Sequence, residues 1–271
     1  MRERHPCFDQ EIPPDAVLWR YMDFPKFVSM VQERALYFSR SDLLGDPLEG
    51  SLTQAVEVAR QARLANPPVG RTPEELQRIL EHSQRFMRHG RLMVYVNCWH
   101  RGDHESMALW KGYGGGPYAV AVRTTFGRLD SLLPEKFRGS TGGSSPARLD
   151  DPVPEMPIYL GPVRYIDHRS TTLRMEHEDN LFGPLAYKSI AYASENEVRA
   201  IQWNIPGYDS SGELPLPSGF QVPIDLQQLV SDIVVSPLAP EWFTPVVRAT
   251  FERCGFDFTI SGSVTSTPPV H

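Results

Sequence analysis

The sequence predicts an α+β protein with mixed, mainly antiparallel sheets and flanking helices. Strand-like segments often follow one another along the chain, which does not fit the alternating order of a doubly wound parallel sheet. Two helix-like segments have clear apolar stripes, so we expect them to pack against the sheets. With 271 residues, 41% of them hydrophobic and 10% aromatic, the chain can bury one large core.

The chain opens with a predicted strand, a helix and a second strand. Residues 16–22 (AVLWRYM) are rich in strand-forming side chains. Residues 23–35 show helical spacing of apolar residues behind Asp23, which can cap the helix. Residues 36–51 begin as a strand and continue as a turn-rich loop, in which a glycine and an Asp-Pro pair end the strand.

The clearest helix is expected at residues 72–90. Thr72 and Glu75 form a capping box, Pro73 takes the first helical position, and Gly90 can end the helix. Its apolar stripe consists of Leu76, Ile79, Leu80, Phe86 and Met87.

The rest of the chain predicts more strands than helices. We expect strands at 92–100, 117–124, 158–167, 195–204, 232–240 and 256–261, a short helix near 104–113 and a longer one at 241–255. The Gly/Ser/Pro-rich stretch 138–157 predicts a long connection. The expected organisation is an N-terminal extension at 1–15, one domain at 16–262 and a flexible tail at 263–271.

Bulk properties exclude several classes of protein. The formal net charge of −6 argues against a dedicated nucleic-acid binder, which needs clustered lysines and arginines. The three cysteines are too few and too far apart for a disulfide scaffold or a structural zinc site. No secretory signal or membrane-length apolar run is present. We therefore expect a soluble cytoplasmic protein, although a toxin exported by a dedicated machine would share these features.

Charged residues alternate in the predicted strand that contains SENEVR (194–199). Glu195, Glu197 and Arg199 would point to one face of that strand, where two carboxylates repel and need compensation. A bound substrate could supply it, but an exposed edge strand, where charge discourages aggregation, explains the pattern too. Arg20, between Trp19 and Tyr21, raises the same choice between a bound anion and a solvated strand face.

An acidic loop follows the second strand. Asp42, Asp46 and Glu49 lie within eight residues and could bind a hard cation, but their spacing fits no EF-hand. Turn chemistry, with an Asp side chain holding the backbone of the bend, is the simpler interpretation.

Two further stretches are weak candidates. His100, Asp103 and His104 are possible metal ligands, but a polar loop in which Asp103 caps the next helix is favoured. The glycine-rich stretch 112–118 could approach a phosphate. It follows a helix and precedes a strand, however, which is the reverse of the dinucleotide-binding order, so a turn is favoured.

Several motifs in this order resemble a large, uncharacterised prokaryotic family. Its members typically have a Leu-Tyr-His-Tyr-Thr strand, an Asn-Asp-Pro-x-Glu loop, a Trp-x-x-Tyr helix and a Glu-x-Glu-x-Arg strand. Here the matching stretches are LWRYMD (18–23), LYFSRSDLLGDPLEG (36–50), LWKGYGGGPYAVAV (109–122) and SENEVR (194–199). The chain has Arg20 where histidine is usual.

The layout of that family looks like the ADP-ribosyltransferase superfamily. The resemblance implies a fold of that type and an enzyme that transfers ADP-ribose from NAD⁺ to an acceptor, possible acceptors being a protein, a nucleic acid or a small molecule, in a toxin or phage-defence setting. It implies that Glu197 stabilises the cationic sugar, that Ser39 braces this glutamate, and that Glu195 orients the acceptor.

The resemblance also assigns NAD⁺-binding residues. Arg20 would hold the pyrophosphate or the adenosine ribose through charge-assisted hydrogen bonds. Tyr113, or Tyr37, would stack on the nicotinamide ring. Tyr21, in the motif that contains Arg20, and Trp110, in the motif that contains Tyr113, are expected to line the NAD⁺ site.

Two alternatives stay open beside this enzyme. A non-catalytic module on the same fold would bind a ligand or partner in a cleft without NAD⁺ affinity. A metal-dependent hydrolase would bring the acidic loop onto the strand with Glu195 and Glu197. Convergence of Arg20, Ser39 and Glu197 in one cleft would instead favour the transferase.

Overall fold

The computed structural model describes residues 4–139, 155–173, 182–203 and 217–266, without the side chains of residues 86–89. Most of the predicted connection, the end of the predicted tail, and the stripe residues Phe86 and Met87 therefore lie outside the described residues and side chains. Among the described helices, none is long and apolar enough to cross a membrane.

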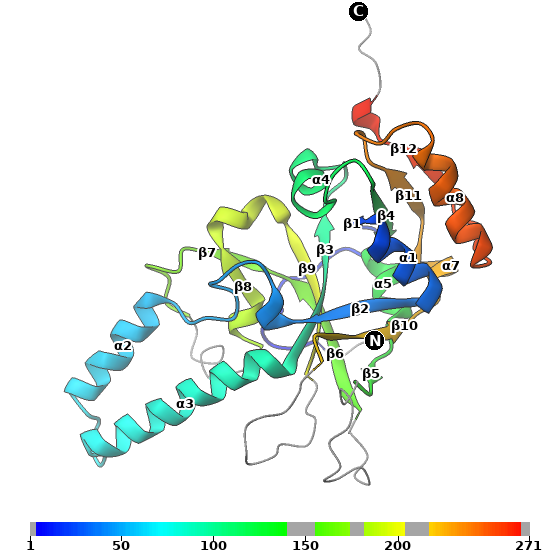
Figure 1. Ribbon diagram of the computed structural model, residues 1–271. Coiled ribbons are helices and arrows are strands. Elements are labelled where there is room, and N and C mark those ends of the chain that lie inside the picture. The colour runs from blue at the N-terminus through cyan, green and yellow to red at the C-terminus, as the bar shows by residue number, and fades with distance from the viewer. Residues whose placement is uncertain (1–3, 140–154, 174–181, 204–216, 267–271) are drawn as a thin grey trace, which may run out of the picture.

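The described residues form an α+β fold in which one large, mostly antiparallel sheet is flanked by helices, as predicted (Figure 1). The strands are β1 (Val17–Asp23), β2 (Ala35–Arg40), β3 (Val94–Arg101), β4 (Ala119–Thr125), β5 (Lys136–Phe137), β6 (Met156–Pro162), β7 (Arg164–Ile166), β8 (Tyr187–Ser189), β9 (Glu197–Trp203), β10 (Gly219–Pro223), β11 (Asp232–Val235) and β12 (Ile260–Gly262). Their main order is β12-β11-β4-β1-β3-β9-β6-β5, with the β2–β10 pair attached to β3 and a separate parallel β7–β8 pair.

The α-helices are α1 (Phe24–Glu33), α2 (Gln54–Ala65), α3 (Pro73–Met93), α4 (Met107–Tyr113), α5 (Phe126–Leu132), α7 (Leu226–Leu229) and α8 (Phe243–Arg253). Short 3₁₀ helices are η1 (Ser41–Leu43), η2 (Pro184–Ala186), η3 (Ile190–Glu195) and η4 (Val264–Ser266). In Figure 1, α2 and α3 extend together away from the sheet, at the lower left. Helices α1 and α8 lie beside the sheet at the opposite side.

Local signals placed several elements correctly. Asp23 caps α1 by accepting a hydrogen bond from the Lys26 N–H, and the predicted capping box of α3 is present at Thr72 and Glu75. The prediction for α4 was wrong in its cap, because Ser106 rather than Asp103 accepts the helical N–H. Helices α2, α5 and α7 and strands β5, β8 and β10 were not predicted.

The two faces of the large sheet differ because side chains alternate along each strand. Helices α1, α5, α7 and α8 pack on one face, the core face, and complete the largest apolar cluster with residues such as Phe27, Leu36 and Trp99. On the opposite face, α4 covers one apolar cluster around Trp19 and Trp110. A second cluster on that face surrounds the paired start of β3 and end of β9.

Strands β1 and β2 meet the same edge of β3 at different points. Trp19 of β1 pairs with His100, whereas Ser39 of β2 pairs with Val96, so the ladder is interrupted between them. There the carbonyl oxygen of Tyr37 accepts hydrogen bonds from the side chains of Asn97 (2.9 Å) and Arg20 (3.3 Å). These side chains thus supply hydrogen bonds to a backbone carbonyl at the point where the ladder is interrupted, because a buried carbonyl needs a partner.

The predicted N-terminal extension is packed against the domain. Cys7 and Phe8 are buried in the cluster around the start of β3, and Ile12 is buried in the core-face cluster. Phe8 lies so close to Gly161 of β6 that a Cβ at that position would stand 2.2 Å from the Phe8 Cγ atom. At the other end, Ser263 of the predicted tail is buried, and its hydroxyl donates to Glu105 at 2.6 Å.

Candidate functional site

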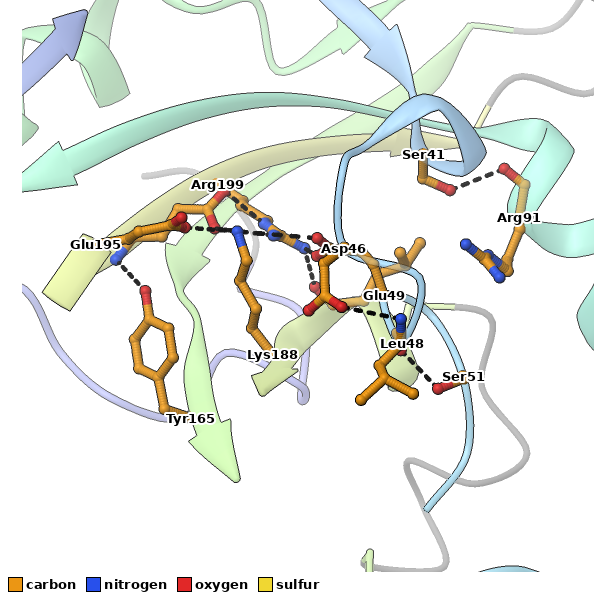
Figure 2. Close-up of polar contacts among 12 residues, drawn as sticks. Ser41, Asp46, Leu48, Glu49, Ser51, Arg91, Tyr165, Lys188, Glu195 and Arg199 are labelled. Carbon is orange, nitrogen blue, oxygen red and sulfur yellow. Dashed lines mark hydrogen bonds and ion pairs between the residues drawn. The ribbon is translucent and has the colours of Figure 1, made fainter. Parts of the chain in front are cut away.

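A cluster of charged side chains lies between the two apolar clusters just described on the face opposite the core face, and four of its five members are buried. This charged network consists of Glu49, Lys188, Glu195, Glu197 and Arg199. Glu49 comes from the loop after η1, Lys188 from β8, Glu195 from the end of η3, and the other two from β9. Figure 2 shows Lys188 and Arg199 lying among the acidic side chains, with the loop that contains Asp46 and Glu49 closing over them.

Glu197 and Arg199 form the interior of the charged network. Both oxygens of Glu197 accept hydrogen bonds at 2.8 Å from Arg199, whose guanidinium also donates to the Leu185 carbonyl at 2.8 Å. Arg199 forms an ion pair with Glu49 as well, and it is only 1% exposed. An arginine this deeply buried is tolerated because its planar fork binds carboxylates in pairs.

Lys188 links the interior of the charged network to its open end. Its ammonium donates to Glu195 at 2.5 Å and to Glu197 at 3.3 Å. Glu195 also accepts a hydrogen bond of 2.6 Å from the hydroxyl of Tyr113, a residue that is 48% exposed. Glu195 is therefore the carboxylate of the charged network that lies nearest to solvent, since Glu49 and Glu197 are buried.

The pKa values in the charged network follow from burial and charge. Burial alone would raise the pKa of Glu197, but Arg199 and Lys188 lower it to about 2. For Glu49, burial and the neighbouring Glu197 outweigh Arg199 and raise the pKa above its usual value. For Lys188, Glu197 and Glu49 outweigh burial and raise the pKa, so the ammonium stays charged. Counted as formal charges, the five groups are three carboxylates and two cations, one negative charge more than positive.

Backbone contacts hold the first residues of β9 in place. The Glu197 N–H donates to the Tyr165 hydroxyl at 2.8 Å, and the Glu195 carbonyl lies 2.6 Å from Nδ1 of His100. Burial lowers the pKa of His100, so its ring is neutral at pH 7. Asn196 has a left-handed backbone with φ of 39°, which turns the chain from η3 into β9.

The alternation that sequence predicted for Glu195, Glu197 and Arg199 is partly correct. The strand starts only at Glu197, and Glu195 belongs to η3. The exposed-edge interpretation is wrong, because β9 lies between β3 and β6. The carboxylates are compensated within the protein, by Lys188 and Arg199.

Arg20 and Glu197 do not meet, so the convergence of Arg20, Ser39 and Glu197 that would have favoured the transferase is not present. Strand β3 separates β1 from β9, and His100 of β3 pairs with both Trp19 and Glu197, so those residues share a face and Arg20 takes the other. The Arg20 guanidinium lies 5.8 Å from the centre of the Trp99 ring on the core face. Burial lowers its pKa to about 10, and its Nη1 atom is buried without a hydrogen-bond partner.

The other residues expected at the NAD⁺ site are divided between buried and open positions. Tyr21 and Trp110 are buried and pack edge-to-face on each other, with ring centres 4.9 Å apart. Tyr37 is 39% exposed, and its ring lies against Gly219 of β10. Ser39 is on the same face as Glu197, and its hydroxyl lies 3.5 Å from the Arg40 carbonyl. Of the expected aromatic residues, Tyr113 is thus the one that contacts the charged network.

The acidic loop combines both interpretations that the sequence left open. Asp46 makes the expected turn by accepting the Leu48 N–H at 2.9 Å, and Asp42 pairs with Arg40. Glu49 reaches the charged network, so the loop and β9 do converge. Cationic side chains occupy the position between them, and the described residues contain no group of three His, Cys, Asp or Glu side chains suited to a metal ion.

Sequence reasoning missed Lys188, Tyr165 and Asn196. Lys188 lies on a three-residue strand, which in the described part of the chain pairs with short β7, so no periodic pattern marked it. The available signal was a single lysine among the apolar residues of 181–191, where burial requires a partner. Searches for similarity to known proteins found no matching family model and no matching curated protein.

Proposed function

We propose that the charged network is the active site of an enzyme that cleaves the nicotinamide–ribose bond of NAD⁺ and passes ADP-ribose to an acceptor. The observation that supports this most is the surplus negative charge of the charged network, whose open end is Glu195. Cleavage of that bond builds positive charge on the ribose, and a fixed carboxylate stabilises such a transition state.

In this proposal Glu195 faces the sugar, and Glu197 acts as a positioning residue. Both oxygens of Glu197 are held by Arg199, whereas Glu195 has an oxygen shared only with the hydroxyl of partly exposed Tyr113. The C1′–N bond breaks with its electron pair leaving on nicotinamide, which becomes neutral. The acceptor then attacks C1′, and Glu195 takes its proton.

Lys188 and Tyr113 hold that carboxylate. Lys188 donates to one oxygen of Glu195, and Tyr113 donates to the other from the end of α4. Burial and the bond to Glu195 raise the pKa of Tyr113, so the phenol remains a donor at neutral pH. The exposed part of its ring offers a stacking surface for nicotinamide.

The test is a turnover assay with NAD⁺ labelled in its adenylate part. Wild type should release nicotinamide and attach label to an acceptor or to water, and Glu195→Gln should lower that rate roughly 10²–10³-fold. Glu252→Gln, an exposed change on α8, is the matched control and should behave as wild type. NAD⁺ binding without nicotinamide release in wild type would favour the non-catalytic module.

A further inference from the structure

A polar hollow lies beside the charged network, between the N-terminal residues and strands β6 to β8. Its volume is about 660 Å³, within the range of small-molecule sites. Its lining includes Gln10, Arg101, Arg164, Thr171, Thr172 and Asn196. We propose that this polar hollow binds the phosphate group of a phosphorylated small molecule.

The charge of the polar hollow favours an anion. Among the described residues of its lining, Arg101 and Arg164 are the charged ones, although the whole chain has a net charge of −6. The remaining polar lining residues include two threonine hydroxyls and the amides of Gln10 and Asn196, which can donate hydrogen bonds. Two planar guanidinium groups with neutral donors match the oxygen-rich surface of a phosphate.

Each arginine is held in place by a neighbouring side chain. The Asn196 side chain accepts from Arg101 at 3.2 Å and donates to its carbonyl at 2.6 Å. Arg164 forms an ion pair with Asp9, so a bound phosphate would compete with that carboxylate for the guanidinium.

The polar hollow adjoins the charged network but has different residues. Asn196 joins Glu195 to Glu197, and Tyr165 lines the polar hollow while accepting the Glu197 N–H. A phosphate bound here would therefore lie next to the start of β9. The inference stands whether or not NAD⁺ is the substrate of the charged network.

The test is calorimetric titration of the full chain with inorganic phosphate, AMP and adenosine. Phosphate and AMP should bind, and adenosine should not. Arg164→Gln should weaken AMP binding roughly 10- to 100-fold, the range for a hydrogen bond to a charged group. Asp9→Asn should tighten it, because the ion pair no longer competes for Arg164. Arg169→Gln, on an exposed side chain outside the polar hollow, should change nothing.

Arg164→Gln and Asp9→Asn are expected to change the AMP affinity in opposite directions. A loss of structure would weaken binding in both variants, so the two directions distinguish a binding effect from misfolding. Should Arg164→Gln not fold, Thr172→Val removes one donor and should weaken AMP binding. Displacement of phosphate by NAD⁺ would identify the anion as part of the proposed substrate, and no displacement would identify a separate phosphorylated ligand; both support the site. Equal binding of adenosine and AMP, or unchanged affinity in Arg164→Gln, would overturn the proposal.

Discussion

The two faces of the large sheet are stabilised by different forces. The core face buries apolar side chains under α1, α5, α7 and α8. There the hydrophobic stabilisation scales with the apolar area removed from water and does not depend on direction. The opposite face carries five charges, four of them buried, between two small apolar clusters, and each buried charge requires its partners. The core face therefore tolerates exchange among apolar residues, whereas the other face depends on particular residues, as a functional site does.

The largest effect is expected from removing the central cation. Arg199→Met would leave Glu49 and Glu197 buried without their main partner, and should destabilise the protein by about 3–5 kcal/mol. Urea unfolding measures this loss. If Arg199→Met together with Glu197→Gln is no more stable than Arg199→Met alone, the loss does not come from an uncompensated carboxylate.

The next largest effect is expected on the pH dependence of stability, which comes from the charged network. Because the pKa of Glu197 is lowered to about 2 from 4.5, its ionised form stabilises the fold above pH 4.5, and that stabilisation is lost as pH falls through about 2. The shift corresponds to about 3 kcal/mol. Unfolding free energies at pH 7, 5, 4 and 3 should fall in wild type and fall less in Glu197→Gln.

Glu49 should act in the opposite sense. Its raised pKa means that ionisation destabilises the fold as pH rises from 4.5 through the folded-state value. Glu49→Gln should therefore steepen the loss of stability on acidification, measured in the same unfolding series. Identical pH profiles for both variants would show that the two glutamates do not differ in environment.

A smaller effect is expected where the N-terminal residues cover the charged face. Gly161 pairs with Arg199, and a Cβ at Gly161 would meet the Phe8 ring. Gly161→Ala should destabilise the protein by about 1–3 kcal/mol through overpacking. Differential scanning calorimetry tests this, with Gly262→Ala, which meets nothing within 4 Å, as the control.

The smallest effect is expected on the core face. Leu36→Met keeps the apolar volume of a fully buried residue and should cost less than about 1.5 kcal/mol. Chemical denaturation measures it beside Arg199→Met. A cost equal to that of Arg199→Met would remove the distinction between the faces.

Local chemistry explains what could be predicted from the sequence. The capping box of α3 and the strand-forming side chains of β1 are local features of the sequence, so they were visible. Helix α2 was not, because only Val56 and Arg60 of it are buried and its apolar stripe is short. The spacing of Glu195, Glu197 and Arg199 predicted a concentration of charge.

Tertiary structure decided the rest of the site. Lys188 and Glu49 are distant in sequence from β9 and reach it only through the β7–β8 pair and the acidic loop. The face on which Arg20 lies depends on which residue of β3 it flanks, and register is set by pairing across the sheet. No local signal in one sequence contains that information.

The most direct test of the central claim is a thermal-shift titration with NAD⁺ that compares the two faces. A ligand at a hundredfold excess over its dissociation constant stabilises the native state by about 2.7 kcal/mol. We predict that NAD⁺ raises the melting temperature of wild type and of Arg20→Ala, on the core face, but not of Tyr113→Ala, beside Glu195. A shift that disappears in Arg20→Ala and persists in Tyr113→Ala would contradict the assignment of NAD⁺ to the charged network.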